Sequence, residues 1–317
     1  MSEKDDPMPR ASIPDRVLKS LPDDLLGRLG VDGDLLAPTR QLLETVARDP
    51  AGAARTAELV AGFRGRIGQY LGQQTLLSQA DLVGLGGVEG AVPLAALIVS
   101  APDVEEFWRG LGYPEPIIAD TLADLGRQIR KTIAVTGRFG LGQASWLEMI
   151  WRGGFAQLGR LQFELRRSTL GREGAGEGPL VLSAHIAPIG SLAPDLVAAS
   201  LARAHGFFTA HFPELAAEPG AFDIAICESW LLDTELMGQM AGSNMDSFAR
   251  LWTVWERPVS DGSGIFFGFD RPFADAEKLP GILDELPYDS RLHRAMVDLW
   301  RRGGHVHNCS GWLTLPR

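Results

Sequence analysis

Residues 180–208, LVLSAHIAPIGSLAPDLVAASLARAHGFF, decide the fold of this chain. Leu180–Ile186 is mostly apolar and bounded by turn residues, which predicts a strand. Gly190 and Ser191 follow in a short turn, and Pro194 is typical of the first position of a helix. The apolar residues after Pro194 recur at helical spacing. The stretch therefore predicts a strand–turn–helix unit, the building block of α/β domains.

The sequence on either side of this unit alternates short apolar stretches with single helices. Ser290 is the expected cap of a late helix. Such alternation predicts an α/β (α+β) domain with a mixed sheet and covering helices. The expected strands are 155–166, 180–186, 222–230, 251–256, 264–269, 304–307 and 312–315.

The first part of the chain has mainly helical signals. Two segments, Arg40–Ala47 and Ala53–Leu71, are rich in Ala, Leu and Arg, which favour helices. Asp103 with Glu106, and Ser145 with Glu148, have the spacing of capping boxes at helix starts.

A glycine-rich break at Gly137–Gly142 suggests a domain boundary. We therefore predict a mainly helical N-terminal domain at 1–140 and the α/β domain at 141–317. Residues 1–14 have the composition of a disordered tail.

Composition and charge exclude several classes of protein. The net charge of −10 argues against a nucleic-acid partner, because binding to the phosphate backbone needs basic surfaces. The N-terminus has no apolar segment typical of a secretory signal, and the apolar stretch Ala91–Ala101 is too short for a membrane span. Cys227 and Cys309 are the two cysteines, which is typical of a cytoplasmic protein with reduced thiols.

The predicted turn before Pro194 is a candidate anion site. The first N–H groups of a helix have no partner within the helix, and the helix dipole places partial positive charge there. Such a terminus binds phosphate without a basic residue. The alternative is an ordinary strand–helix crossover, and Asp195 in the first turn favours that alternative because its charge competes for the same dipole.

His185, near the end of the predicted strand, is the candidate general base, since imidazole accepts a proton near neutral pH. The alternative is a histidine hydrogen-bonded within the core. A triad of Ser229, His185 and Asp233 is conceivable, but no spacing in the sequence selects it.

The segment His305-Val-His307-Asn-Cys309 is a rival site. In a regular strand the three side chains share one face, as zinc ligands would. No fourth ligand is near in the sequence, so we expect no metal here. A metal-dependent hydrolase using His305, His307 and Cys309 stays open as an alternative function.

Seven stretches of the chain are distinctive as phrases. They are TLADLGRQI (121–129), WLEMIWRGGFAQLGRLQFEL (146–165), HIAPIGSLAPDLVAASL (185–201), FFTAHFPE (207–214), CESWLLD (227–233), SNMDSF (243–248) and GGHVHNCSGWLTL (303–315). Together they resemble an actinobacterial acyltransferase family with a dedicated N-terminal domain and a GNAT-like C-terminal domain. That family includes the long-chain N-acyltransferases of teicoplanin-type glycopeptide biosynthesis, which transfer a fatty acyl group from CoA to a glucosamine nitrogen.

The resemblance implies a GNAT-like domain that binds acyl-CoA as donor and needs no metal. The acceptor would be an amine-bearing small molecule or a glycopeptide. His185 would lie where the acceptor amine meets the thioester. Substrate would contact Trp151, Ser229 and Trp230. The expected CoA-binding residues are Ile186, Ile189, Gly190, Ser191 and Leu192.

The chain departs from the usual GNAT pattern in two places. PIGSLAP at 188–194 stands in place of the Arg/Gln-x-x-Gly-x-Gly/Ala loop, and the tyrosine that often serves as general acid is not evident after the expected strand 222–230. These departures leave the details of the cofactor contacts and of thiolate protonation open. A second alternative function is a non-catalytic GNAT-like protein that only binds an acyl-CoA or a partner.

Overall fold

The computed structural model describes residues 22–72, 74–171, 178–273 and 278–317. The chain forms two compact units. The first runs to Phe107 and adds Leu122–Thr132 and Arg138–Gly153; the second comprises Trp108–Thr121, Ile133–Gly137 and Gly154–Arg317. The expected tail at 1–14 lies outside the described residues, and the boundary between 140 and 141 stays a prediction.

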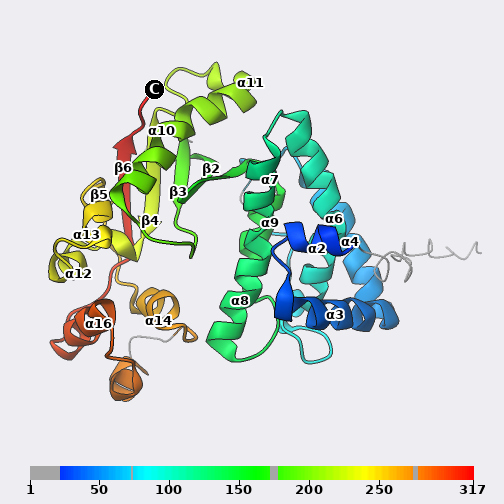
Figure 1. The fold of residues 1–317 in the computed structure, drawn as a ribbon, viewed down its shortest axis with the longest axis horizontal. Helices are drawn as coiled ribbons and strands as arrows, with labels where there is room; N and C mark the ends of the chain where they lie inside the picture. Colours follow the sequence, from blue (N-terminus) through cyan, green and yellow to red (C-terminus); the bar gives the residue numbers. More distant parts are fainter. Residues whose placement is uncertain (1–21, 73, 172–177, 274–277) are drawn as a thin grey trace, which may run out of the picture. The chain divides into compact units, whose positions relative to one another are not determined.

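The part of the chain before residue 154 is helical where it is described, as its composition predicts (Figure 1). Helix α3 is the best example, because its buried Leu42, Leu43 and Val46 follow a helical spacing. The helices are α2 (Asp23–Arg28), η1 (Gly33–Leu35), α3 (Leu36–Arg48), α4 (Pro50–Arg66), α5 (Gln79–Val83), α6 (Ala91–Gly110), α7 (Glu115–Leu122), α8 (Asp124–Thr136) and α9 (Ala144–Trp151).

Neither capping box predicted in this part forms. Helix α6 continues through Pro102, so Asp103 and Glu106 lie inside it. An interior proline costs about 3 kcal/mol. The helix nevertheless persists, and its apolar N-terminal half is almost entirely buried, including Leu94 and Leu97. Tertiary burial therefore overrides the local signal.

The second expected box is wrong for a different reason. Helix α9 begins at Ala144 with Gln143 before it, so Ser145 is not the cap. Glu148 is buried and accepts hydrogen bonds from Arg66, from the Thr75 hydroxyl and from the Leu76 N–H. Its role in the structure is to anchor a distant loop within the first unit.

The second unit contains a six-stranded mixed sheet, which confirms the predicted fold class. The strand order is β1-β2-β3-β4-β6-β5, and only the β3–β4 pair is parallel. The strands are β1 (Phe155–Leu158), β2 (Leu161–Arg167), β3 (Leu180–His185), β4 (Ile224–Ser229), β5 (Thr253–Glu256) and β6 (Cys309–Thr314).

Helix α10 (Pro194–His211) joins the two parallel strands, as a parallel connection requires (Figure 1). It buries Val197, Leu201 and Phe208 along one face. The Ser290 hydroxyl accepts from the His293 N–H and caps the last helix, as predicted. The remaining helices are α11 (Pro213–Ala216), η2 (Trp230–Leu232), α12 (Thr234–Gln239), α13 (Asn244–Ala249), α14 (Asp261–Phe269), α15 (Leu279–Ile282), η4 (Leu283–Glu285) and α16 (Arg291–Arg301).

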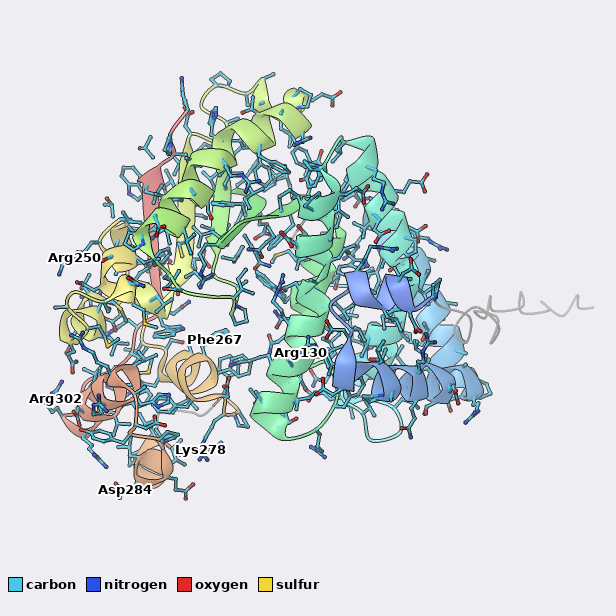
Figure 2. The ribbon with its side chains drawn as sticks, viewed as in Figure 1. Arg130, Arg250, Phe267, Lys278, Asp284 and Arg302 are labelled. Carbon is cyan, nitrogen blue, oxygen red and sulfur yellow. The ribbon has the colours of Figure 1, made fainter. Side chains whose placement is uncertain are left out.

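Three of the expected strands are wrong in detail. Residues 155–166 form a hairpin instead of one strand, with Gly159 at a φ of +79° in its turn. Residues 264–269 belong to α14, where Ile265 and Phe266 are buried while Phe267 is 54% exposed (Figure 2). Residues 304–307 precede β6, and His307 makes only an isolated bridge. Short apolar stretches do not distinguish strand from helix until their neighbours are known.

Within the described residues, no helix is both long and apolar enough to span a membrane.

Candidate active site

His185 ends β3 and is held by a carboxylate from the neighbouring strand. Its Nε2 lies 3.1 Å from Oε2 of Glu164 on β2. Gln162 is the cross-strand partner of His185, so Glu164, two residues on, projects from the same face of the sheet. The side chain of Glu164 is almost buried, while that of His185 is 22% exposed. The imidazole is therefore anchored but still reachable.

An aromatic ring fixes the plane of this imidazole. Phe155 of β1 stacks on His185 with ring centroids 5.7 Å apart and an angle of 19° between the planes. A carboxylate accepts hydrogen bonds only, so Nε2 of a neutral His185 is the donor to Glu164. The lone pair then resides on Nδ1, which makes Nδ1 the nitrogen that can take up a proton.

The turn between β3 and α10 presents an array of backbone donors. Ile189 N–H donates to the Ala187 carbonyl over 2.8 Å. Across the described ranges, the N–H groups of residues 190–193 donate to no other group of the chain. Helix α10 begins immediately afterwards, and its N-cap residue, Ala193, has no side-chain acceptor. Unpaired N–H groups before a helix start form a site for an anion.

Arg160, in the turn of the β1–β2 hairpin, supports this loop. Its Nε donates to the Ser191 carbonyl over 3.0 Å, and its Nη1 donates to the Ala187 carbonyl over 2.9 Å. The Ser191 hydroxyl also accepts from Asn244 over 2.7 Å. The loop conformation is thus held by the hairpin and by the start of α13.

The family models match nearly the whole described chain. Residues 155–313 match a GNAT-like C-terminal domain, and residues 22–153 match an N-acyltransferase N-terminal domain. The chain belongs to the GNAT-like N-acyltransferase family. It is therefore an acyltransferase, as the sequence resemblance implied.

Solved structures support the assignment at moderate identity. An acyltransferase in complex with decanoyl-CoA is 27% identical, with a TM-score of 0.76 over 98% of this chain and 91% of that one. An acyltransferase with decanoyl-CoA and teicoplanin is 27% identical, with a TM-score of 0.73 over 94% and 90%. A complex with CoA and 10C-teicoplanin is 26% identical, with a TM-score of 0.71 over 93% and 87%. No curated protein matches the chain.

The residues predicted to bind substrate fall in two parts of this N-acyltransferase. Ser229 ends β4, and its hydroxyl accepts from the Leu231 N–H at the start of η2, which contains the buried Trp230. Because β3 and β4 are parallel, Ser229 and His185 lie at the same edge of the sheet. Trp151 ends α9 in the first unit, where it is buried and donates to the Leu97 carbonyl. The substrate roles of all three stay predictions.

The conceivable triad does not form in the enzyme. His185 pairs with Glu164, whereas Asp233 accepts from both the backbone and the ring of His307. The Ser229 hydroxyl caps η2. The three side chains thus serve three separate contacts.

The expected one-sided arrangement of His305, His307 and Cys309 is also wrong, because the two histidines precede β6. His305 Nδ1 lies 2.7 Å from Asp261, and His307 Nδ1 lies 3.0 Å from Asp233. Among described residues there is no group of three or more His, Cys, Asp or Glu side chains arranged to hold a metal. Each imidazole has its own carboxylate, which does not favour the alternative of a metal-dependent hydrolase.

Sequence reasoning missed Glu164 and Arg160 in this acyltransferase. The signal for Glu164 was available, since a glutamate within the apolar strand LQFEL is unusual and a buried carboxylate needs a partner. Arg160 had no comparable signal, because its partners lie in a loop that only the folded sheet brings near.

Proposed function

We propose that this chain transfers a fatty acyl group from acyl-CoA to the amine of an amino sugar on a glycopeptide-type natural product. The observation that carries the proposal is the end of β3, where an anchored imidazole adjoins a loop of unpaired N–H groups. Family membership and the likeness to acyltransferases solved with decanoyl-CoA and teicoplanin support the same reaction.

The donor would bind along the segment from Ile186 to Leu192. Backbone groups of Ile186, which directly follows β3, are suited to the amide groups of pantetheine. The N–H groups of Gly190, Ser191 and Leu192 are suited to the diphosphate, with the start of α10 adding its dipole. The exposed Asp195 weakens that field but leaves the loop donors in place.

His185 would act as general base in a direct transfer. The acceptor nitrogen attacks the thioester carbonyl and forms the amide, while its proton moves to Nδ1 of His185 and the carbon–sulfur bond breaks. The departing CoA thiolate takes up one proton, so the products are the amide and CoA thiol. Glu164 fixes the tautomer and stabilises the imidazolium that forms. Holding the two substrates together supplies a further part of the rate.

The acceptor would approach the edge of the sheet where β3 and β4 end. Ser229 and Trp230 are the proposed contacts there. Trp151, in the first unit, is a separate proposed substrate contact. Both cysteines are free and buried, which supports a reducing compartment, and we place the reaction in the cytoplasm, within antibiotic biosynthesis.

Calorimetry and a transfer assay test the proposal. Titration with decanoyl-CoA should give a stoichiometric binding isotherm, and release of CoA thiol should require a glucosamine-bearing glycopeptide. Binding with no thiol release across a panel of amines would instead support a non-catalytic acyl-CoA-binding protein. Absence of binding by folded protein would refute the donor assignment.

A further inference from the structure

Arg160 is a buried cation that faces carbonyl oxygens instead of a carboxylate. The residue is 9% exposed, and its two hydrogen bonds through Nε and Nη1 go to the carbonyls of Ser191 and Ala187. No ion pair joins it to any carboxylate of the described ranges. Burial lowers the pKa of its guanidinium, without an opposing contribution from a nearby acid.

A second buried arginine shows how unusual this is. Arg152 in the first unit is also buried, but its guanidinium contacts the buried carboxylate of Glu148. Burial of a charge is costly unless the charge is paired. Arg160 has only the partial charges of two carbonyls, so it keeps an unbalanced positive charge directly beneath the loop.

The hydrogen bond to Ser191 also sets the direction of one loop donor, the Leu192 N–H. The Ser191–Leu192 peptide is trans and planar, so the Leu192 N–H points opposite to the Ser191 carbonyl. Because that carbonyl faces Arg160, the Leu192 N–H faces away from it. Arg160 Nη2, the second amino group, makes no hydrogen bond to the described chain.

The position of Arg160 is itself fixed by α10. The Ser200 hydroxyl accepts from the backbone N–H of both Arg160 and Leu161, at 2.8 and 3.2 Å. At Gly159 a Cβ would lie 3.3 Å from this hydroxyl, and the φ of +79° favours glycine. The hairpin turn is therefore bound closely to the same helix whose start adjoins the loop.

We propose that Arg160 is the positioning residue and the cation of the diphosphate subsite: it fixes the direction of the Leu192 N–H, holds the 187–193 loop at two carbonyls and provides the positive charge that this loop lacks. The inference rests on the proposed function and names the part of the donor that the loop recognises. It also accounts for the missing Arg/Gln-x-x-Gly-x-Gly/Ala motif, because a basic residue from a hairpin distant in sequence takes the place of one inside the loop.

The test compares a donor that has the diphosphate with one that does not. Arg160→Met should lower kcat/KM for decanoyl-CoA by about 10- to 100-fold, the range for losing interactions with a charged group, and mostly through KM. S-decanoylpantetheine has no phosphate. With this donor, the kcat/KM of Arg160→Met should equal the kcat/KM of the unmodified enzyme with the same donor. An equal loss with both donors, or no loss with either, would overturn the inference.

Two further measurements keep the outcome interpretable. The unmodified enzyme is assayed first, and transfer from neither donor would refute the proposed function instead of the role of Arg160. If Arg160→Met does not fold, as judged by circular dichroism, Arg160→Lys is used. This variant keeps the charge but cannot bind both carbonyls as arginine does. KM for decanoyl-CoA should therefore rise severalfold, while KM for S-decanoylpantetheine should stay unchanged. An equal change in KM for both donors would again overturn the inference.

Discussion

Two histidine–carboxylate pairs in the second unit have similar geometry but different surroundings. At the end of β3, Glu164 makes its one side-chain hydrogen bond within the described chain, to His185. The second pair joins His307, which precedes β6, to the fully buried Asp233. Asp233 accepts hydrogen bonds from Arg257, from the Glu235 N–H, and from both the N–H and the ring of His307. A carboxylate that serves one imidazole can tune it for proton transfer, whereas a carboxylate with many partners holds segments together.

The largest expected effect is a loss of turnover when the first pair is disrupted. Replacing His185 with Ala should lower kcat by about 10²–10⁴, the usual range for loss of a general base. Decanoyl-CoA affinity should stay nearly unchanged, because the proposed contacts to the donor are loop N–H groups and Arg160 instead of the imidazole. The loss should shrink as pH rises, since more of the acceptor amine is then neutral. Steady-state kinetics from pH 6 to 9 check this, and near-normal turnover at pH 7 would remove His185 from the mechanism.

A substitution in the second pair should lower the stability of the fold instead of the turnover. Asp233→Asn should destabilise the fold by about 3 kcal/mol, because it removes one partner of a buried ionic network. Urea unfolding measures the change. Turnover by the folded fraction, measured well below the melting temperature, should be close to normal. If Asp233→Asn instead abolished turnover at unchanged stability, the roles of the two pairs would have to be exchanged.

The Cys309 thiol should make the free energy of unfolding depend on pH. Burial raises the pKa of the Cys309 thiol to about 11 from an ordinary value of 9.0. The unfolded chain then ionises first, so this contribution to stability is complete below pH 9 and is lost between pH 9 and 11. The difference in unfolding free energy between the unmodified protein and Cys309→Ser should fall by about 2–3 kcal/mol over that interval. A pH-independent difference would contradict the assigned burial of the thiol.

The smallest expected effect on turnover comes from changing Glu164, the partner of the proposed general base. Glu164→Gln keeps a hydrogen-bonding side chain but removes the negative charge that stabilises the imidazolium. We expect kcat to fall about 10-fold, with KM for decanoyl-CoA unchanged. An unchanged kcat in Glu164→Gln would make the carboxylate a structural partner, like Asp233.

Local signals predicted the elements that matter most for the site. The strand expected at Leu180–Ile186 is β3, and the helix expected from Pro194 is α10. Both follow from residue patterns within one short stretch, where strand propensity, a turn and an N1 proline agree. By contrast, the GIFFGF stretch at 264–269 is helical because the packing around Ile265 and Phe269 decides between two conformations that its apolar character allows equally.

The sequence by itself determined the family, the fold class, the strand–turn–helix unit and the candidate base. It did so because these depend on neighbouring residues and on recognisable phrases. Only the tertiary structure decided which carboxylate orients His185, which cation supports the donor loop and which acids hold His305 and His307. Those partners are 21 to 74 residues apart in the chain. Strand register and loop closure bring them together, and neither is encoded by the spacing of any single segment.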